Sequence, residues 1–362
     1  MCYYTQVIKV NFDALGSLVD VDDVDLDYHR TVGTDYDGDF ENEETIDIIF
    51  KYYRKRGFPY YEYSEYEKLT EMRKLRKLSC EDYISDGIVR QTMHGLGLAW
   101  SYFPHSWSVR CNDKKSPMDA FTDDESFKKV IRKCLMFRAK YDGKLISDMY
   151  LRKILKIATG VQGVSNFRPT AAASIYEKYA GDGVVWDMSC GWGGRLVGAM
   201  MSNRVKKYIG TDPSTLTFNG LCRMRDDFSY LGKEVELHCM GSETYLPQPS
   251  TLDLCFTSPP YFDTERYSTE DTQSYKKFST YEDWLEGFWK QTMLNCKHGL
   301  KTGGHMLLNV ADVGKYKLET ATQSIARKLG FVQEGDLNLA LSALNTGGFK
   351  YEPVFVFRKI DE

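Results

Sequence analysis

Four consecutive residues, Ser258-Pro259-Pro260-Tyr261, carry the most specific chemical signal in this sequence. They follow the apolar run Leu252–Phe256, and the two prolines fix two φ angles and end that run in a rigid loop. An exocyclic amino group on a nucleobase is a poor nucleophile because its lone pair is delocalised into the ring. The Ser258 hydroxyl and the Pro259 carbonyl are two acceptors for its N–H hydrogens, and Tyr261 could stack on a base turned out of its helix. The motif therefore predicts chemistry on a base amino group.

A glycine-rich turn earlier in the chain predicts a site for a nucleoside-containing cofactor. Residues 187–195 read Asp-Met-Ser-Cys-Gly-Trp-Gly-Gly-Arg and follow the apolar run Val184–Trp186. Such a turn lets the backbone approach a ligand closely and presents helix N–H groups to it. Asp212 follows the next apolar run, about 20 residues later, where an acid can bind ribose hydroxyls. The full GxGxxG pattern and a second pyrophosphate loop are both missing, so S-adenosylmethionine is favoured over a dinucleotide.

The elements that must position these residues alternate between short apolar runs and helical patterns from residue 184 onward. Predicted strands are Val184–Trp186, Tyr208–Gly210, Val235–Leu237, Leu252–Phe256 and Met306–Leu308. Predicted helices are Arg195–Ser202, Tyr281–Lys297 and Leu318–Leu329, and the runs Phe331–Leu341 and Val354–Phe357 predict a closing antiparallel hairpin. This alternation predicts an α/β fold with a mainly parallel sheet that binds its ligands at the carboxyl ends of the strands.

The N-terminal part of the chain has a different character. Residues 1–50 carry 13 acids and two bases, although the whole chain has a net charge of only −4. We expect residues 1–44 to form a solvated acidic arm, and mimicry of nucleic acid is an alternative role for it. Further helices are predicted at Ile46–Lys55, Tyr66–Leu78, Asp124–Lys140 and Ile146–Ala158. Segment 51–77 interleaves aromatic and basic residues, a pattern that suits nucleic-acid contact as well as ordinary packing.

Composition excludes several other classes of protein. The nine cysteines include no CxxC pair and are odd in number, which indicates reduced thiols in a cytoplasm rather than a disulfide framework or a cysteine zinc site. The six histidines are dispersed, and no metal site is predicted. No run approaches the roughly 20 apolar residues that cross a bilayer, and the first residues do not resemble a secretory signal.

Taken together, the segments 187–195 and 257–261 resemble the DNA amino-methyltransferases, which combine an FxGxG-type cofactor motif with a [DNS]-PP-[YFW] catalytic motif. The resemblance covers roughly residues 160–360. It implies a class I methyltransferase (Rossmann-like) fold with a seven-stranded, mainly parallel sheet behind a mainly helical N-terminal domain. It also implies S-adenosylmethionine as the cofactor and DNA as the partner. The serine version of the motif is commoner among enzymes that methylate N4 of cytosine, and the aspartate version among those that methylate N6 of adenine.

The resemblance assigns roles to individual residues. The catalytic set is Ser258, Pro259, Pro260 and Tyr261. The cofactor-binding set is Arg168, Asp187, Ser189, Gly191, Trp192, Gly193, Asp212, Ser242 and Glu243. Arg168 belongs to the segment Ser165–Ala172 and would face the cofactor carboxylate, although a surface position is an alternative. Ser189 stands where the family has phenylalanine, so Trp192 is expected to supply the missing apolar contact.

The expected organisation is an acidic arm (1–44), a helical domain for nucleic-acid recognition (45–160) and a methyltransferase domain (161–362). The polar and aromatic insertion Phe262–Thr280 is expected either to close over a flipped base or to be a plain surface loop. Three alternatives stay open: RNA as the substrate, a protein amide as the substrate, and a non-catalytic subunit of a DNA-modification assembly. A bacterial cell or a phage-infected host, as in restriction–modification, is the expected setting, and the oligomeric state is open.

Overall fold

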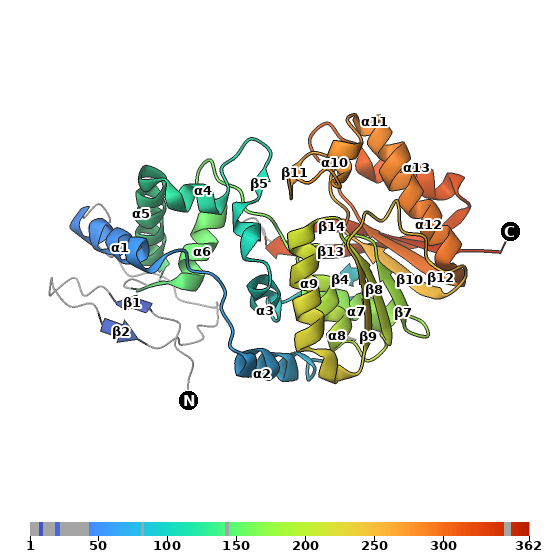
Figure 1. The fold of residues 1–362 in the computed structure, drawn as a ribbon, viewed down its shortest axis with the longest axis horizontal. Coiled ribbons are helices and arrows are strands. Elements are labelled where there is room, and N and C mark those ends of the chain that lie inside the picture. The colour runs from blue at the N-terminus through green and yellow to red at the C-terminus, as the bar shows by residue number, and fades with distance from the viewer. Residues whose placement is uncertain are drawn as a thin grey trace. The chain divides into compact units, whose positions relative to one another are not determined.

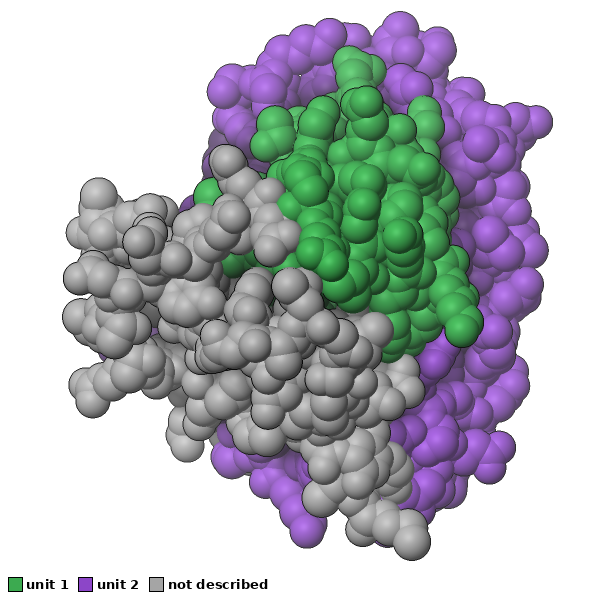
Figure 2. Space-filling view, turned by 90° about the vertical axis from the view of Figure 1, so that its left-hand side faces the viewer, with its two compact units in different colours: residues 1–60, 107–164 green, residues 61–106, 165–362 purple. Residues whose placement is uncertain are grey.

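The computed structural model of the chain describes residues 7–9, 19–21, 43–80, 83–141, 145–343 and 349–361. The chain divides into two compact units: unit 1, residues 1–60 with 107–164, and unit 2, residues 61–106 with 165–362. Figure 2 colours them green and purple. The predicted boundary near residue 160 is close to the junction at residue 164, but residues 61–106 cluster with unit 2. Most of the predicted acidic arm lies outside the described residues.

Unit 1 has a helical core, as the apolar periodicity of its sequence predicts. Its main helices are α1 (Glu43–Arg56), α4 (Pro117–Thr122), α5 (Asp124–Tyr141) and α6 (Asp148–Ile157), and its strands are β1 (Val7–Lys9), β2 (Val19–Val21) and β6 (Leu145–Ser147). The helix predicted from Ile146 starts two residues later because the Ser147 hydroxyl accepts the N–H of Tyr150 at 3.2 Å and caps it. The buried Asp148 accepts hydrogen bonds from Tyr53 at 2.9 Å and Arg56 at 2.7 Å.

Unit 2 is built on a nine-stranded sheet in the order β3-β4-β13-β14-β12-β10-β7-β8-β9 (Figure 1). The strands are β3 (Ile84–Ser85), β4 (Ile88–Val89), β7 (Val184–Asp187), β8 (Lys207–Thr211), β9 (Glu234–His238), β10 (Leu252–Thr257), β12 (Leu300–Asn309), β13 (Phe331–Ala343) and β14 (Phe349–Lys359). Strands β9, β8, β7, β10 and β12 run parallel, whereas β14 is antiparallel to both β12 and β13. The predicted class I sheet of seven mainly parallel strands is confirmed, and β3 and β4 extend its edge.

Helices cover this sheet, and Figure 1 shows α8 and α9 on one side of the strands and α12 and α13 on the other. The helices are α3 (Leu96–Ser101), α7 (Pro169–Tyr179), α8 (Gly194–Met201), α9 (Thr215–Asp227), α12 (Gln291–Gly299) and α13 (Leu318–Lys328). The predicted helix Tyr281–Lys297 consists of α11 (Tyr281–Trp284), a π-helical stretch (Leu285–Lys290) and α12. Within the part of the chain that is described, no helix is long and apolar enough to cross a bilayer.

Helix α2 (Glu65–Leu75) carries the basic residues that the sequence suggested for nucleic-acid contact. It begins with a capping box in which Ser64 and Glu67 exchange hydrogen bonds. Lys68 of α2 pairs with Asp227 at 2.6 Å. Asp227 is the last residue of α9, whereas Asp212 lies close to the first residue of this helix. A 13-residue helix is about 20 Å long. The structure therefore places Lys68 about one helix length from Asp212, away from the predicted site.

Candidate active site

The glycine-rich turn after β7 is held tightly against the segment that precedes α7. Gly191 and Gly193 have φ angles of 53° and 68°, which favour glycine. A Cβ atom on Gly194 would lie 1.9 Å from the carbonyl oxygen of Phe167. The Asn166 amide donates to the carbonyl of Trp192 at 2.9 Å. The structure thus brings together the turn and the segment 165–172, which the sequence analysis had linked only by resemblance.

A buried ion pair stabilises the glycine-rich turn. Arg195 Nε donates to Asp187 Oδ2 at 2.8 Å, and both side chains are almost fully inaccessible to solvent. The same oxygen accepts the Tyr208 hydroxyl at 2.7 Å, and Oδ1 accepts the N–H of Ser189. Arg195 also donates to the Ser189 carbonyl. These contacts hold the Asp187 carboxylate against the turn that follows β7.

Asp212 lies where the ends of β7 and β8 meet. Its Oδ2 accepts the N–H of Gly191 at 2.9 Å, and its Oδ1 accepts the N–H of Ser214 at 3.0 Å. Burial raises the pKa of Asp212 to about 7, although these two hydrogen bonds pull it down. Each oxygen keeps a further lone pair, because a carboxylate can accept about four hydrogen bonds. Asp212 is therefore placed to accept ligand hydroxyls beside the turn.

Ser242 and Glu243, after β9, differ in how their side chains are used. The Ser242 hydroxyl is hydrogen-bonded to that of Thr292 at 2.8 Å. Glu243 Oε1 pairs with Lys277 at 2.6 Å, with the glutamate side chain only 6% exposed. Its buried Oε2 has no hydrogen-bond partner among the described residues. A buried acceptor without a donor is costly, and a donor on a bound ligand would satisfy it.

Arg168 immediately precedes α7 at its N-cap position and is partly buried. Burial lowers the pKa of its guanidinium, and no carboxylate in the described residues forms an ion pair with it. The start of α7 is fixed by a hydrogen bond of 2.9 Å from the N–H of Thr92 to the Thr170 hydroxyl. A partly desolvated cation without a counter-charge suits the carboxylate of an amino-acid-like ligand.

The catalytic motif emerges from the middle of the sheet. β10 lies between β7 and β12, and its last residue, Thr257, pairs with Leu308. The loop that follows includes Phe262, whose φ of +52° is uncommon for a residue other than glycine. Its ring is buried against Tyr316 and Trp284, with centroid distances of 5.5 and 6.1 Å. This packing holds a backbone conformation that costs about 1–3 kcal/mol, and so fixes the end of the motif.

Tyr261 has a partly buried ring. It packs against the core cluster of unit 2. The nearby Ser258 side chain and Ala311 backbone lower the pKa of its hydroxyl. Burial raises the pKa of Tyr261, and the nearby carboxylates of Glu352 and Glu265 raise it further. Tyr261 therefore stays protonated in the range where the protein would act.

Trp192 is surrounded by aromatic rings that the sequence analysis did not assign to the site. Its ring centroid lies 5.3 Å from His105, 6.0 Å from Phe103, 6.1 Å from Trp100 and 5.8 Å from Tyr267. Burial lowers the pKa of His105 to about 4, so this ring is neutral. The density of aromatic residues between Trp100 and Trp107 was the available signal, but nothing in it indicated that these rings contact Trp192.

The insertion Phe262–Thr280 contacts all three predicted cofactor loops, which follow β7, β8 and β9 in that order. Its Tyr267 contacts Trp192 in the first loop. Its Glu270 accepts the N–H of Thr215 at 3.0 Å in the second, and its Lys277 pairs with Glu243 in the third. The insertion is thus packed over the carboxyl edge of the sheet.

One polar pair beside the motif was not predicted. Asn309 ends β12, and its side chain donates to the Pro353 carbonyl at 3.1 Å and is close enough to the Glu352 carboxylate to lower its pKa. Glu352 is half-buried, and burial raises its pKa. A lone glutamate at the start of a strand gives no signal in the sequence, because its closeness to Tyr261 depends on the order of the strands.

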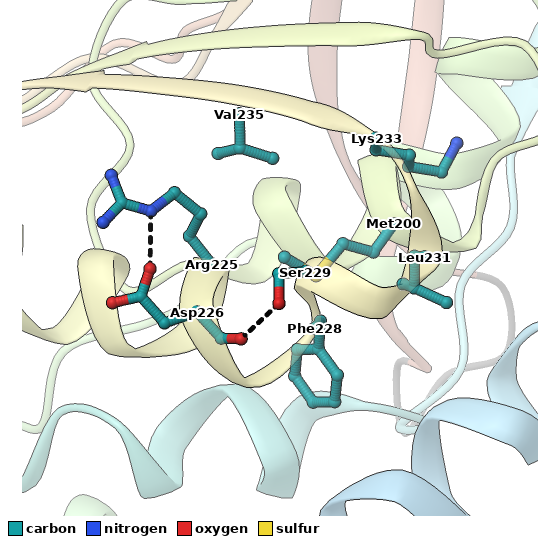
Figure 3. Close-up of a pocket in the computed structure, with 8 residues that line it drawn as sticks. All are labelled: Met200, Arg225, Asp226, Phe228, Ser229, Leu231, Lys233 and Val235. Carbon is teal, nitrogen blue, oxygen red and sulfur yellow. Dashed lines mark hydrogen bonds and ion pairs between the residues drawn. The ribbon is translucent and has the colours of Figure 1, made fainter.

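A separate hollow of about 220 Å³ lies between the end of α9 and the start of β9 (Figure 3). Its lining residues are Met200, Arg225, Asp226, Phe228, Ser229, Leu231, Lys233 and Val235. Figure 3 shows Arg225 turned to Asp226, which it contacts at 2.8 Å. The hollow contains none of the predicted site residues and lies at the opposite edge of the sheet from Asp212.

Comparison with known proteins gives one family match. Residues 252–361 match the N6/N4 family of DNA methylases, which confirms the predicted resemblance over that range. No curated protein matches the chain in sequence.

Several solved structures are similar to the chain at low identity. A methyltransferase from Pyrococcus furiosus is 17% identical, with a TM-score of 0.39, and the match covers 59% of this chain and 96% of the Pyrococcus chain. An S-adenosylmethionine-dependent methyltransferase from Methanosarcina mazei is 12% identical, with a TM-score of 0.37, and covers 52% and 98%. Magnesium protoporphyrin IX methyltransferase from Synechocystis, with bound S-adenosylmethionine, is 12% identical, with a TM-score of 0.37, and covers 53% and 79%.

Proposed function

We propose that the chain is an S-adenosylmethionine-dependent methyltransferase that methylates an exocyclic amino group of a base in DNA. N4 of cytosine is the favoured target and N6 of adenine the next. The observation that carries this proposal is the position of Ser258-Pro259-Pro260-Tyr261 at the carboxyl end of β10, beside the turn after β7 and inside the matched range 252–361.

The chemistry of the available side chains fits S-adenosylmethionine, which when bound supplies a methyl group on a positively charged sulfur. Arg168 would hold its carboxylate and Asp212 its ribose hydroxyls. Glu243 Oε2 would accept a hydrogen bond from its adenine amino group. The glycine-rich turn from Gly191 to Gly193 and the Trp192 ring would lie beside the bound cofactor. Asp187, Ser189 and Ser242 would act by holding these loops in place.

The catalytic loop would bind the target base from the other side. The Ser258 hydroxyl oxygen has two lone pairs that can accept hydrogen bonds. With the carbonyl of Pro259, they would take the two N–H hydrogens of the target amine and favour its nucleophilic form. Tyr261 would stack on the flipped base, an interaction worth about 1–3 kcal/mol. Proximity and alignment would supply most of the rate enhancement.

Target recognition is proposed for two parts of the chain. Residues 45–160 are the candidate nucleic-acid recognition region, and the insertion Phe262–Thr280 is the candidate cover for a flipped base. Exposed cations at the end of α2 (Arg73, Lys74, Arg76 and Lys77) would then contact phosphates away from the catalytic loop, because α2 is tied to the far end of α9.

The test uses purified protein with tritiated S-adenosylmethionine and separate samples of double-stranded DNA, single-stranded DNA and RNA. Labelled products are digested to nucleosides and separated. We expect label in N4-methylcytosine or N6-methyladenine from DNA, and its loss in Ser258→Ala and Tyr261→Ala. Label in RNA alone would move the substrate to RNA. No transfer despite measured cofactor binding would overturn the proposal and point to a protein substrate or a missing subunit.

A further inference from the structure

Glu352 is a carboxyl group beside the catalytic motif that the proposed mechanism leaves unused. It is half-buried in β14, directly before Pro353, whose carbonyl accepts a hydrogen bond from the Asn309 side chain at 3.1 Å. Its charge is close enough to Tyr261 to raise the pKa of the tyrosine hydroxyl. Asn309 is the last residue of β12, which pairs with β10, and β10 leads into Ser258. Glu352 is therefore a neighbour of the motif in space, although about 90 residues separate them in sequence.

Strand register explains this closeness. Thr257 of β10 pairs with Leu308 of β12, and Asn309 pairs with Val354 of β14. Because β14 is antiparallel, its residues before Val354 lie towards the carboxyl ends of β10 and β12. Glu352 is thus level with Ala311, whose backbone is close enough to the Tyr261 hydroxyl to lower its pKa. The sheet gathers Ser258, Tyr261 and Glu352 at one edge.

No ion pair neutralises Glu352 within the described residues. The charged or titratable groups that face it are Lys350 on its own strand, Glu319 at the start of α13 and Tyr261. Lys350 lowers the pKa of Glu352 and Glu319 raises it, while burial is the largest influence and raises it. A partly desolvated carboxylate without a bound counter-ion suits a positive charge that is present only during turnover.

Methyl transfer to an amine creates such a charge. The sulfur–carbon bond breaks with its electron pair left on sulfur, and the nitrogen lone pair forms the new nitrogen–carbon bond. The positive charge therefore moves to the nitrogen, which then loses one proton. Ser258 and Pro259 are neutral acceptors and provide no charge to offset it.

We propose that Glu352 supplies the carboxylate that stabilises the target nitrogen while it is positively charged, and that it accepts the proton before water removes it. This inference rests on the proposed function. The carboxylate must be ionised to act, so kcat should fall as the pH drops through the pKa of Glu352. That pKa lies above the ordinary glutamate value because the group is partly buried.

The experiment compares Glu352→Gln with Glu334→Gln, the same chemical change on β13. Glu334 is ion-paired with Arg358 and His305 towards the other end of the sheet. We would measure kcat and KM for DNA from about pH 5 to pH 9, cofactor Kd by calorimetry, and DNA Kd by fluorescence anisotropy. Glu352→Gln should lower kcat about hundredfold, leave both Kd values within about twofold, and remove the acidic limb of the pH profile. Glu334→Gln should retain wild-type kcat.

A second variant distinguishes loss of the carboxyl group from misfolding of the protein. Glu352→Ala removes the carboxyl group, and added formate should restore part of its kcat because the small acid can enter the space. Wild-type kcat and pH profile in Glu352→Gln would overturn the inference while leaving the proposed function standing. An equal loss of cofactor affinity would also overturn it, because that result indicates a structural role. Absence of transfer to nucleic acid by the wild-type protein would remove the proposed function and this inference together.

Discussion

The parallel strands of unit 2 begin at one side of the sheet, the amino edge, and end at the other, the carboxyl edge. The charged groups at these two edges differ in whether the protein itself provides their partners. At the amino edge, Asp253 accepts the N–H of Val184 at 2.9 Å and pairs with Lys301 at 2.7 Å. Lys233 donates to two backbone carbonyls, each at 2.6 Å, and burial lowers its pKa to about 8. Polar groups at this edge therefore satisfy one another and hold the strands together.

The carboxyl edge keeps groups that the protein alone does not satisfy. Arg168 has no ion-pair partner among the described residues, Glu243 Oε2 has no donor, and Asp212 is buried with a pKa near 7. Each of these features costs stability in the absence of a ligand. The difference indicates that the amino edge contributes to folding, whereas the carboxyl edge is arranged for binding. The following predictions test that division.

The largest effect is expected from the ion pair beneath the carboxyl edge. Arg195→Leu leaves the Asp187 carboxylate buried without its counter-charge, which should lower the free energy of unfolding by about 3–5 kcal/mol. Urea denaturation followed by tryptophan fluorescence measures this. The matched control is Arg225→Leu, which removes an exposed pair with Asp226 and should cost less than about 1 kcal/mol. Similar losses in the two variants would contradict the role given to Arg195.

Asp212→Asn should weaken cofactor binding by about tenfold to hundredfold, because a hydrogen bond to a charged acceptor is worth about 1.5–3 kcal/mol. The wild-type carboxylate is ionised above its pKa of about 7, so cofactor affinity should rise as the pH increases through 7. Calorimetry at about pH 6 and pH 8 measures both effects. The asparagine variant should lack this part of the pH dependence, and an unchanged dependence would rule out Asp212 as its source.

The same residue gives a stability prediction of defined sign. Its folded pKa is raised above the unfolded value of about 3.8, so the folded state binds the proton more tightly. The contribution of Asp212 to the stability of the ligand-free protein should therefore fall as the pH rises from about 4 to about 7. Asp212→Asn should flatten the unfolding free energy over this range, and denaturation at several pH values checks it.

Arg168→Met should raise the cofactor Kd about tenfold, through loss of a charged contact to the ligand carboxylate. The free energy of unfolding should not fall, because the guanidinium forms no ion pair in the described protein. Arg204→Met, at an exposed arginine outside the site, is the control and should leave Kd unchanged. A clear loss of stability in Arg168→Met with normal affinity would assign this residue to folding instead.

The smallest effect is expected at the amino edge. Asp253→Asn removes the charge that pairs with Lys301 but keeps an acceptor for the N–H of Val184. We expect a loss of about 1 kcal/mol in the free energy of unfolding and no change in cofactor Kd. A weakened affinity in this variant would show that the two edges are coupled and would break the comparison.

Much of unit 2 follows from local patterns in the sequence. The apolar runs and the intervening helical patterns predicted most of the strands of the sheet. The spacing of apolar residues and the length of each segment reflect contacts between residues that are near one another in the chain. The prolines of the motif ended β10 at Thr257, one residue beyond the predicted Phe256, since proline restricts its own backbone whatever surrounds it. The Gly-rich turn and Asp212 were located for similar reasons.

The tertiary structure decided which polar groups are paired and which are left for a ligand. Asp187 and Ser242 were predicted as ligand-binding residues, and only the fold shows that the Asp187 carboxylate pairs with Arg195 and that the Ser242 hydroxyl is hydrogen-bonded to Thr292. Glu352 gave no signal, because only the insertion of β14 between β12 and β13 brings it to Tyr261. A short motif fixes the backbone around it, whereas the partner of a charge depends on strand order and register, which no local pattern specifies.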